Sequence, residues 1–133
     1  MIAFFVALVA TLAALGGAIW AGVTHRRQTH YALVVAMFAL LALAIWRARV
    51  WGSGLVFDGA AGTVQIVHRA AVVATFAIVP LLVWTGVRLA RARGEAAVGA
   101  GRSGHRRAAV WFVAALVAAA ALGTVMTVLA RRV

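Results

Sequence analysis

Residues 108–130 read AAVWFVAALVAAAALGTVMTVLA, a stretch of 23 residues without a charged side chain. A helix of about 20 apolar residues crosses the roughly 30 Å of hydrocarbon in a bilayer. Residues 1–23, 31–46 and 70–87 form three further uncharged runs. The shortest run reaches spanning length if His30 lies at one interface and Arg47 extends to the other. We therefore expect four spanning helices, at about 1–23, 30–48, 66–90 and 107–130.

The overall composition supports this interpretation. Of 133 residues, 66% are hydrophobic and 11% are charged, and the mean hydropathy is +1.06. A soluble domain has about 45–50% apolar and about 25% charged residues. A membrane β-barrel requires alternating ten-residue segments, which this sequence lacks. The sequence thus predicts an all-α integral membrane protein, with residues 1–133 forming a single transmembrane domain: a four-helix up-down-up-down bundle.

The charge distribution indicates a lipid partner rather than a nucleic acid. Thirteen basic and two acidic residues give a net charge of +11, and every basic residue is Arg. The arginines stand at the ends of apolar runs, where they face headgroups and water, and no basic patch alternates with exposed aromatic residues. The chain has no Cys, which excludes disulfides, thiolate metal sites, iron–sulfur clusters and covalent c-type haem.

The arginines also predict the orientation. Connections between the first two and the last two helices carry eight of them, namely Arg26, Arg27, Arg88, Arg91, Arg93, Arg102, Arg106 and Arg107. The opposite side carries five, namely Arg47, Arg49, Arg69, Arg131 and Arg132. The positive-inside rule then puts both connections in the cytoplasm and both termini outside. Arg in place of Lys, with abundant Ala and Val, is typical of a GC-rich prokaryotic genome, so we expect a prokaryotic cell membrane.

Four histidines are the candidate ligands or proton carriers. His25 ends the first predicted helix, and His30, His68 and His105 begin the other three. Because successive helices alternate in direction, His25, His30 and His105 belong to the cytoplasmic side. His68 lies near the outer side, about one membrane thickness away. No single mononuclear site can therefore use all four.

The three inner histidines have two interpretations. Neutral imidazoles on facing helices bind haem iron, copper or zinc. Alternatively, these are interfacial histidines that are solvated and inert. The neighbouring Arg26, Arg27, Arg106 and Arg107 repel a bare divalent cation. They suit haem propionates or phospholipid headgroups, because guanidinium groups pair with carboxylate and phosphate.

His68 differs because it begins a strongly apolar helix. An ionisable group at membrane depth is a functional candidate, and Thr75 follows it at seven-residue spacing on the same face. Asp58 is the acid on the same side, so His68 and Asp58 are a candidate metal pair that a second protein would complete. The alternative is a structural histidine bonded to a backbone carbonyl of a neighbouring helix.

No catalytic residues are predicted, and an enzymatic role is the less favoured one. The sequence has no Ser/His/Asp arrangement with an acid in a span, no paired carboxylates and no phosphate-binding loop. Two local features concern packing instead. Pro80 is expected to kink the third helix, and small residues at four-residue spacing, Ala119, Gly123 and Thr127, form one face of the fourth.

Several short motifs resemble those of a known group. They are His30-Tyr31-Ala32-Leu33, Phe57-Asp58-Gly59, Val67-His68-Arg69, Val79-Pro80-Leu81 and Gly104-His105-Arg106-Arg107-Ala108-Ala109-Val110-Trp111. Together they resemble the small four-helix membrane family typified by YozB and CtaM, over most of the chain from the end of the first helix. The family usually has another histidine near the end of the second helix, where this chain reads Trp46-Arg47-Ala48-Arg49-Val50-Trp51.

The resemblance implies a role in the maturation of a-type haem–copper oxidases. By this resemblance the protein is an assembly factor that handles haem or copper, or chaperones an oxidase subunit. His30, His68 and His105 fall on histidine positions of the family. Two alternatives remain open. One is an accessory subunit of a membrane complex, with no cofactor. The other is a b-type haem electron carrier with His30 and His105 as axial ligands, although such ligands normally lie well inside the helices.

Overall fold

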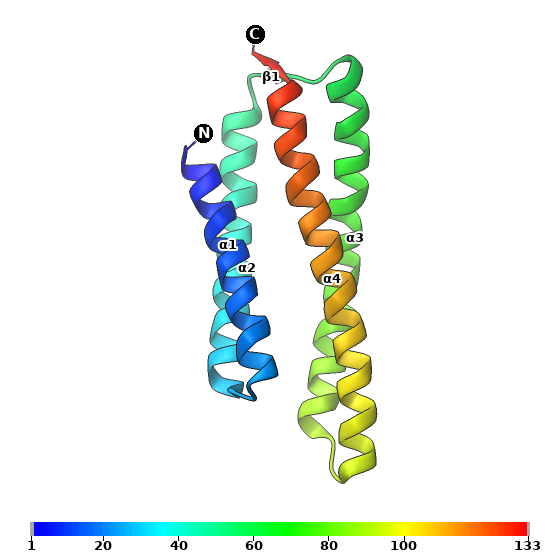
Figure 1. The fold of residues 1–133 in the computed structure, drawn as a ribbon. Helices are drawn as coiled ribbons and strands as arrows, with labels where there is room; N and C mark the ends of the chain where they lie inside the picture. Colours follow the sequence, from blue (N-terminus) through cyan, green and yellow to red (C-terminus); the bar gives the residue numbers. More distant parts are fainter. Residues whose placement is uncertain (1, 133) are drawn as a thin grey trace. The chain divides into compact units, whose positions relative to one another are not determined.

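The computed structural model describes residues 2–132 and is almost entirely helical (Figure 1). Its long elements are α1 (Ile2–Val23), α2 (Arg27–Gly52), α3 (Gly59–Arg91) and α4 (Glu95–Leu129). Each of the four is long and apolar enough to cross a membrane. The predicted all-α class with four spanning helices is confirmed, and the protein is a multi-pass membrane protein.

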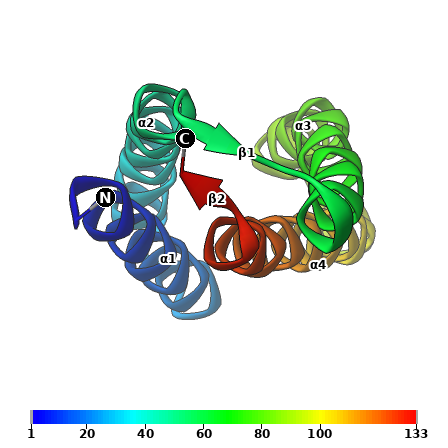
Figure 2. The same ribbon diagram turned by 90° about the horizontal axis from the view of Figure 1, so that it is seen from above.

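The chain divides into two compact units, Met1–Leu55 and Val56–Val133. In the first unit α1 packs along α2, and in the second α3 packs along α4 (Figure 1). Figure 2 shows the same pairing along the helix axes. Two short strands, β1 (Leu55–Val56) and β2 (Arg131–Arg132), pair with each other. The expected single domain is thus organised as two helical hairpins.

Three predicted helix boundaries are corrected. The second helix was expected at 30–48 and extends over Arg27–Gly52, and the third was expected from 66 and begins at Gly59. The largest difference is the fourth helix, expected from 107, which begins at Glu95. The expectation equated helix length with the lipid-spanning run. A helix can extend beyond the hydrocarbon, and α4 does so through good helix formers such as Ala96 and Ala97, despite the glycines at 99, 101 and 104.

The break between α3 and α4 is confined to residues 92–94. The amide of Ala92 donates to the carbonyl of Leu89, and Gly94 takes a φ of 83°, which glycine adopts without strain. Beyond this turn the helices stay in contact, because a Cβ at Gly101 would lie 3.2 Å from the side chain of Leu89. The arginine-rich end of the hairpin is therefore a packed helical extension.

A different turn connects α1 to α2. His25 has a φ of 59°, the left-handed region that usually requires glycine. Its amide donates to Gly22, and the amide of Arg26 donates to Ala21. These two bonds define a Schellman C-cap, with His25 at the left-handed position. The position of His25 is therefore explained by backbone geometry.

Small side chains allow the helices of each hairpin to approach closely. The buried residues of the first hairpin are Ala7, Thr11, Ala14, Leu15, Ala18, Ala21, Met37, Leu41 and Ala44. Those of the second are Ala61, Thr75, Ala108, Phe112, Leu116, Ala119 and Gly123. Membrane helices gain little from expelling water, so close packing of this kind stabilises their association. Ala119 and Gly123 lie on the buried face of α4, as expected, and α3 continues as one helix through Pro80.

Candidate functional site

His30 is held against α1 by its ring nitrogen Nδ1. This atom lies 2.8 Å from the carbonyl oxygen of Ala18, and the side chain is half-buried. The ring packs on Gly22, where a Cβ would lie 3.2 Å from Nδ1. Ala18 stands four residues before Gly22, so its carbonyl also belongs to the helical ladder of α1. The absent side chain of Gly22 makes room for the imidazole.

His68 repeats this arrangement in the second hairpin. Its Nδ1 lies 2.9 Å from the carbonyl oxygen of Ala119 on α4. The ring packs on Gly123, where a Cβ would lie 3.0 Å from Cε1. Ala119 again stands four residues before the glycine. The structural interpretation of His68, a bond to a backbone carbonyl of a neighbouring helix, therefore describes its contact.

His105 uses a side-chain acceptor at the other end of the same hairpin. Its Nδ1 lies 3.3 Å from Oγ1 of Thr85, and the ring packs on Gly86, where a Cβ would lie 3.3 Å from Cε1. The Thr85 hydroxyl donates its hydrogen to the carbonyls of Leu81 and Leu82, at 2.9 and 3.0 Å. Its oxygen is therefore left as an acceptor toward His105.

These contacts define the protonation pattern of two of the three rings. A carbonyl oxygen only accepts, so Nδ1 of His30 and Nδ1 of His68 carry the hydrogen. In a neutral imidazole the lone pair then resides on Nε2. A hydrogen bond from one ring nitrogen to a backbone carbonyl is the usual way in which a protein orients the other nitrogen as a metal ligand. The two carbonyl contacts thus indicate the same tautomer, protonated on Nδ1, for His30 and His68.

The histidines of the second hairpin do not share a site. His105 faces Gly86, which stands 18 residues after His68 on α3. At 1.5 Å per residue this separation corresponds to about 27 Å. The sequence-based deduction that these two histidines lie about a membrane thickness apart agrees with this register.

Two other predicted site residues lie elsewhere. His25 is exposed, in the turn that caps α1. Asp58 is the exposed residue directly before α3, ten residues from His68. That spacing corresponds to about 15 Å of helix, while the His68 ring is directed to Ala119. The geometry offers no way for Asp58 and His68 to ligate one ion while this contact persists.

Arginine and tryptophan accompany the histidines at the connected ends of both hairpins. The guanidinium of Arg26 stacks 4.8 Å from the centre of the Trp20 ring, and that of Arg88 stacks 4.8 Å from Trp84. Both indoles are more than half exposed. Such pairs combine an interfacial aromatic ring with a cation. They provide positive charge close to His30 and His105 without burying it.

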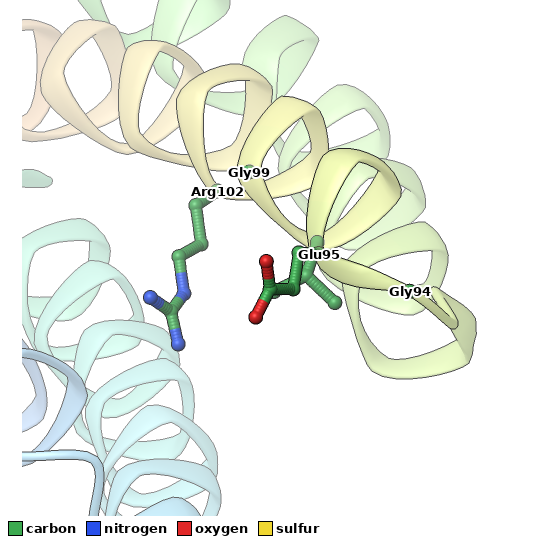
Figure 3. Close-up of a pocket in the computed structure, with 5 residues that line it drawn as sticks. Gly94, Glu95, Gly99 and Arg102 are labelled. Carbon is green, nitrogen blue, oxygen red and sulfur yellow. The ribbon is translucent and has the colours of Figure 1, made fainter.

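A surface depression among the described residues is lined by none of the histidines. It is an open depression at the start of α4, lined by Gly94, Glu95, Val98, Gly99 and Arg102 (Figure 3). Within residues 2–132, no three His, Asp or Glu side chains lie close enough together to hold a metal ion. Each candidate site therefore consists of a single imidazole that packs against a glycine of the neighbouring helix.

Comparison with known proteins adds no family. No protein-family model matches the chain, and neither the curated proteins nor the solved structures contain a match. The resemblance to the YozB and CtaM family stays a prediction, and the functional argument depends on this chain's own geometry.

Sequence reasoning selected the histidines but missed their partners. Gly22, Gly86 and Thr85 had no assigned role, and Gly123 was assigned only to a small-residue face. The signal was present, since a glycine follows Ala18 and Ala119 at the same four-residue spacing. This spacing predicts a histidine contact only when the packing of the two helices is known, because that packing places an imidazole opposite each glycine.

Proposed function

We propose that the protein is a membrane assembly factor for a haem–copper respiratory oxidase, and that it handles haem through His30, His68 and His105. The observation that carries the proposal is the shared orientation of these rings. In each ring Nδ1 lies within hydrogen-bond distance of an oxygen of the neighbouring helix, which is the arrangement by which proteins commonly orient a histidine ligand. A ring with only a packing role could use either nitrogen.

The residues fit haem better than a bare copper ion. Copper bound by protein ligands alone requires several clustered donors, and no such cluster of three occurs within residues 2–132. Haem supplies its own four nitrogen ligands and requires only one or two axial groups. Its propionates also suit the neighbouring guanidinium groups, which would repel a divalent cation.

The residues have separate tasks in this proposal. A bound haem would supply an iron centre and two carboxylates. The Nε2 atoms of the imidazoles would bind the iron, while Gly22, Gly86 and Gly123 set the depth of each ring. Arg26 and Arg88, which stack on exposed indoles, would orient the propionates toward the aqueous side. The exposed apolar faces of the helices would keep water from the macrocycle.

Single imidazoles at half-buried positions favour temporary binding over permanent binding. An electron carrier holds its haem between two axial ligands, and His68 and His105 lie about 27 Å apart along their hairpin. A factor that passes haem to an oxidase subunit requires weaker, reversible ligation. This separation excludes His68 and His105 as the axial pair of a b-type electron carrier.

A second candidate is an accessory subunit without a cofactor. The specific observation in its favour is that all three imidazoles already contribute to helix packing, against glycine and a neighbouring helix. On this alternative the Nδ1 bond is the whole purpose of each histidine. The two candidate functions therefore differ in one respect, namely whether Nε2 of each histidine binds a ligand.

A His→Asn substitution separates these two roles. The amide nitrogen of Asn can replace Nδ1 as donor, but Asn offers no nitrogen lone pair at the Nε2 position. We would delete the gene in its own organism, restore it with wild type or with the three Asn variants, and record the a-type haem absorbance of the membranes. The proposal predicts loss of this absorbance for Asn variants that still accumulate. Full restoration by the triple Asn variant would contradict the proposal and support the accessory subunit.

A further inference from the structure

Four arginines lie at one depth near the connected end of the α3–α4 hairpin. Two contacts between the helices determine the register there, because Gly101 of α4 lies against Leu89 of α3, and the ring of His105 lies against Gly86. Residues 101–107 of α4 therefore stand at about the level of residues 85–89 of α3. This register groups arginines that are far apart in the sequence. We name them the arginine layer: Arg88, Arg102, Arg106 and Arg107.

The side chains of the arginine layer lie on the outside of the hairpin. All four are exposed. Residues between them on α4 face the neighbouring helix instead, since Gly101 and His105 contact α3 and Ala108 is buried. With 3.6 residues per turn, the three arginines of α4 then fall on the faces directed away from α3. The hairpin therefore presents a surface of guanidinium groups at this level.

Trp84 places the arginine layer relative to the membrane. Its indole is 55% exposed and lies near the end of the spanning part of α3, where interfacial tryptophans are common. Arg88 stands one helical turn further, and its guanidinium stacks 4.8 Å from the centre of the Trp84 ring. The level of Leu89 lies about 8 Å beyond Trp84 along the helix, and a headgroup layer is about 5–8 Å thick. The arginine layer therefore lies at the depth of the phospholipid phosphates.

Neither acidic residue of the chain belongs to this layer. The two are Asp58, which directly precedes the other end of α3, and Glu95 at the start of α4. Glu95 stands seven residues before Arg102, about 10 Å further toward the turn, on the same side of α4 (Figure 3). Arg91 and Arg93 also lie toward the turn. The layer thus holds four positive charges without a carboxylate among them.

Lipid phosphate is the anion that occurs at this depth. Guanidinium groups bind phosphate oxygens through charge-assisted hydrogen bonds, often in pairs. Clusters of about four to eight basic residues directly beside a spanning helix are typical of anionic-lipid binding. An acidic protein or a nucleic acid would meet Arg91 and Arg93 at the turn first, and would have to displace headgroups to reach the layer. These arguments favour a lipid over a soluble macromolecule.

We infer that the arginine layer is a binding site for anionic phospholipids of the membrane in which the protein lies. The phosphate of such a headgroup pairs with the guanidinium groups of α4, while Arg88 stays on Trp84. A zwitterionic lipid offers the same phosphate but adds an ammonium group, which the arginines repel. The site therefore selects anionic over zwitterionic lipids. This inference goes beyond the proposed function, because it requires no ligand at any histidine.

Quenching of Trp84 fluorescence by brominated lipids tests this inference. A variant of the full-length chain in which the other four tryptophans are replaced by Phe is reconstituted into vesicles of phosphatidylcholine and phosphatidylglycerol. Bromine is carried either by the phosphatidylglycerol or by the same amount of phosphatidylcholine. We expect the anionic lipid to associate about fivefold more strongly, because one arginine near an anionic surface contributes roughly this factor. High salt should reduce the preference.

Two triple substitutions that remove equal charge provide the comparison. The first combines Arg102→Gln, Arg106→Gln and Arg107→Gln. Its preference for the anionic lipid should fall to about twofold or less. The matched control, at exposed positions in the other halves of α2 and α3, combines Arg47→Gln, Arg49→Gln and Arg69→Gln. It should keep the preference.

Folding is verified separately for each variant. Gln has nearly the helix propensity of Arg, so both triple variants should keep the helix content and Tm of the parent protein. If the single-tryptophan protein does not fold, the same comparison is made with all five tryptophans in place. The preference is then averaged over both membrane surfaces, and its loss in the first triple variant remains measurable against the control.

Three outcomes would overturn the inference while haem handling stands. Equal quenching by the two brominated lipids would show that the layer does not distinguish headgroups. An equal loss of preference in both triple variants would show that net charge, rather than a local site, attracts the lipid. The third is competition by inorganic phosphate that sodium chloride of the same ionic strength does not reproduce. That result would assign the layer to free phosphate instead of lipid.

Discussion

His68 on α3 contacts α4 at two points one helical turn apart. Its Nδ1 lies 2.9 Å from the carbonyl oxygen of Ala119, and its ring occupies the space above Gly123. The same pair of contacts joins His30 to Ala18 and Gly22 in the other hairpin. Each glycine therefore determines how close an imidazole lies to the neighbouring helix, and hence whether its Nδ1 bond forms.

Gly123→Ala should destabilise the protein. The new Cβ would lie 3.0 Å from Cε1 of His68, which is tighter than nine in ten Cβ contacts in proteins. The ring must move and its bond to Ala119 lengthens, so we expect a cost of about 1–3 kcal/mol, as for overpacked cores. Thermal unfolding in detergent, followed by helix content, measures the fall in Tm.

Two other glycines provide controls for this substitution. A Cβ at Gly16 or at Gly99 would meet no atom within 4 Å. Ala at these helical positions should be neutral or gain up to about 1 kcal/mol, because Ala favours helix more than Gly does. In addition, His68→Ala should remove the penalty of Gly123→Ala in the double variant. A Gly123→Ala protein as stable as Gly99→Ala would contradict the packing described here.

His25→Gly should stabilise the protein. His25 occupies the left-handed position of the α1 C-cap, at a φ of 59°. A side chain in this conformation costs roughly 1–2 kcal/mol, which glycine avoids. The predicted change is a higher Tm with unchanged haem binding. A variant that loses haem binding while staying folded would show instead that His25 is a ligand.

Much of the fold follows from the sequence alone. Uncharged runs such as 108–130 predict each spanning helix, because a bilayer excludes charge. The same reasoning fails beyond the membrane, where composition no longer restricts the helix. It therefore missed the extension of α4 from residue 107 back to Glu95. The signal that was not used is Glu95-Ala96-Ala97, three good helix formers that directly follow Gly94.

The candidate sites were only partly predictable. The histidines stand out because an ionisable ring beside an apolar run is costly without a purpose. Their tautomers do not follow from the sequence, because the acceptor of each Nδ1 depends on interhelical register. The register decides that His105 meets Thr85 and Gly86, across a separation of about 20 residues. The separation of Asp58 and His68, by contrast, follows from their ten-residue spacing along α3.

The predicted orientation can be tested directly because the chain has no Cys. Ser53, between α2 and β1, and Ser103, in the extension of α4, are both exposed. With the arginine-rich connections in the cytoplasm, Ser53→Cys should react with a membrane-impermeant maleimide on intact cells. Ser103→Cys should react only after permeabilisation. The reverse labelling pattern would invert the topology proposed here.

The tautomers of His30 and His68 test the central claim most directly. We would record ¹⁵N spectra of histidine-labelled protein in detergent at about pH 8, where an ordinary imidazole is neutral. Single His→Asn variants assign each signal. The structure predicts a protonated Nδ1 and an unprotonated Nε2 for both histidines. A protonated Nε2 with an unprotonated Nδ1 would contradict the bonds to Ala18 and Ala119, and with them the assignment of Nε2 as the ligand atom.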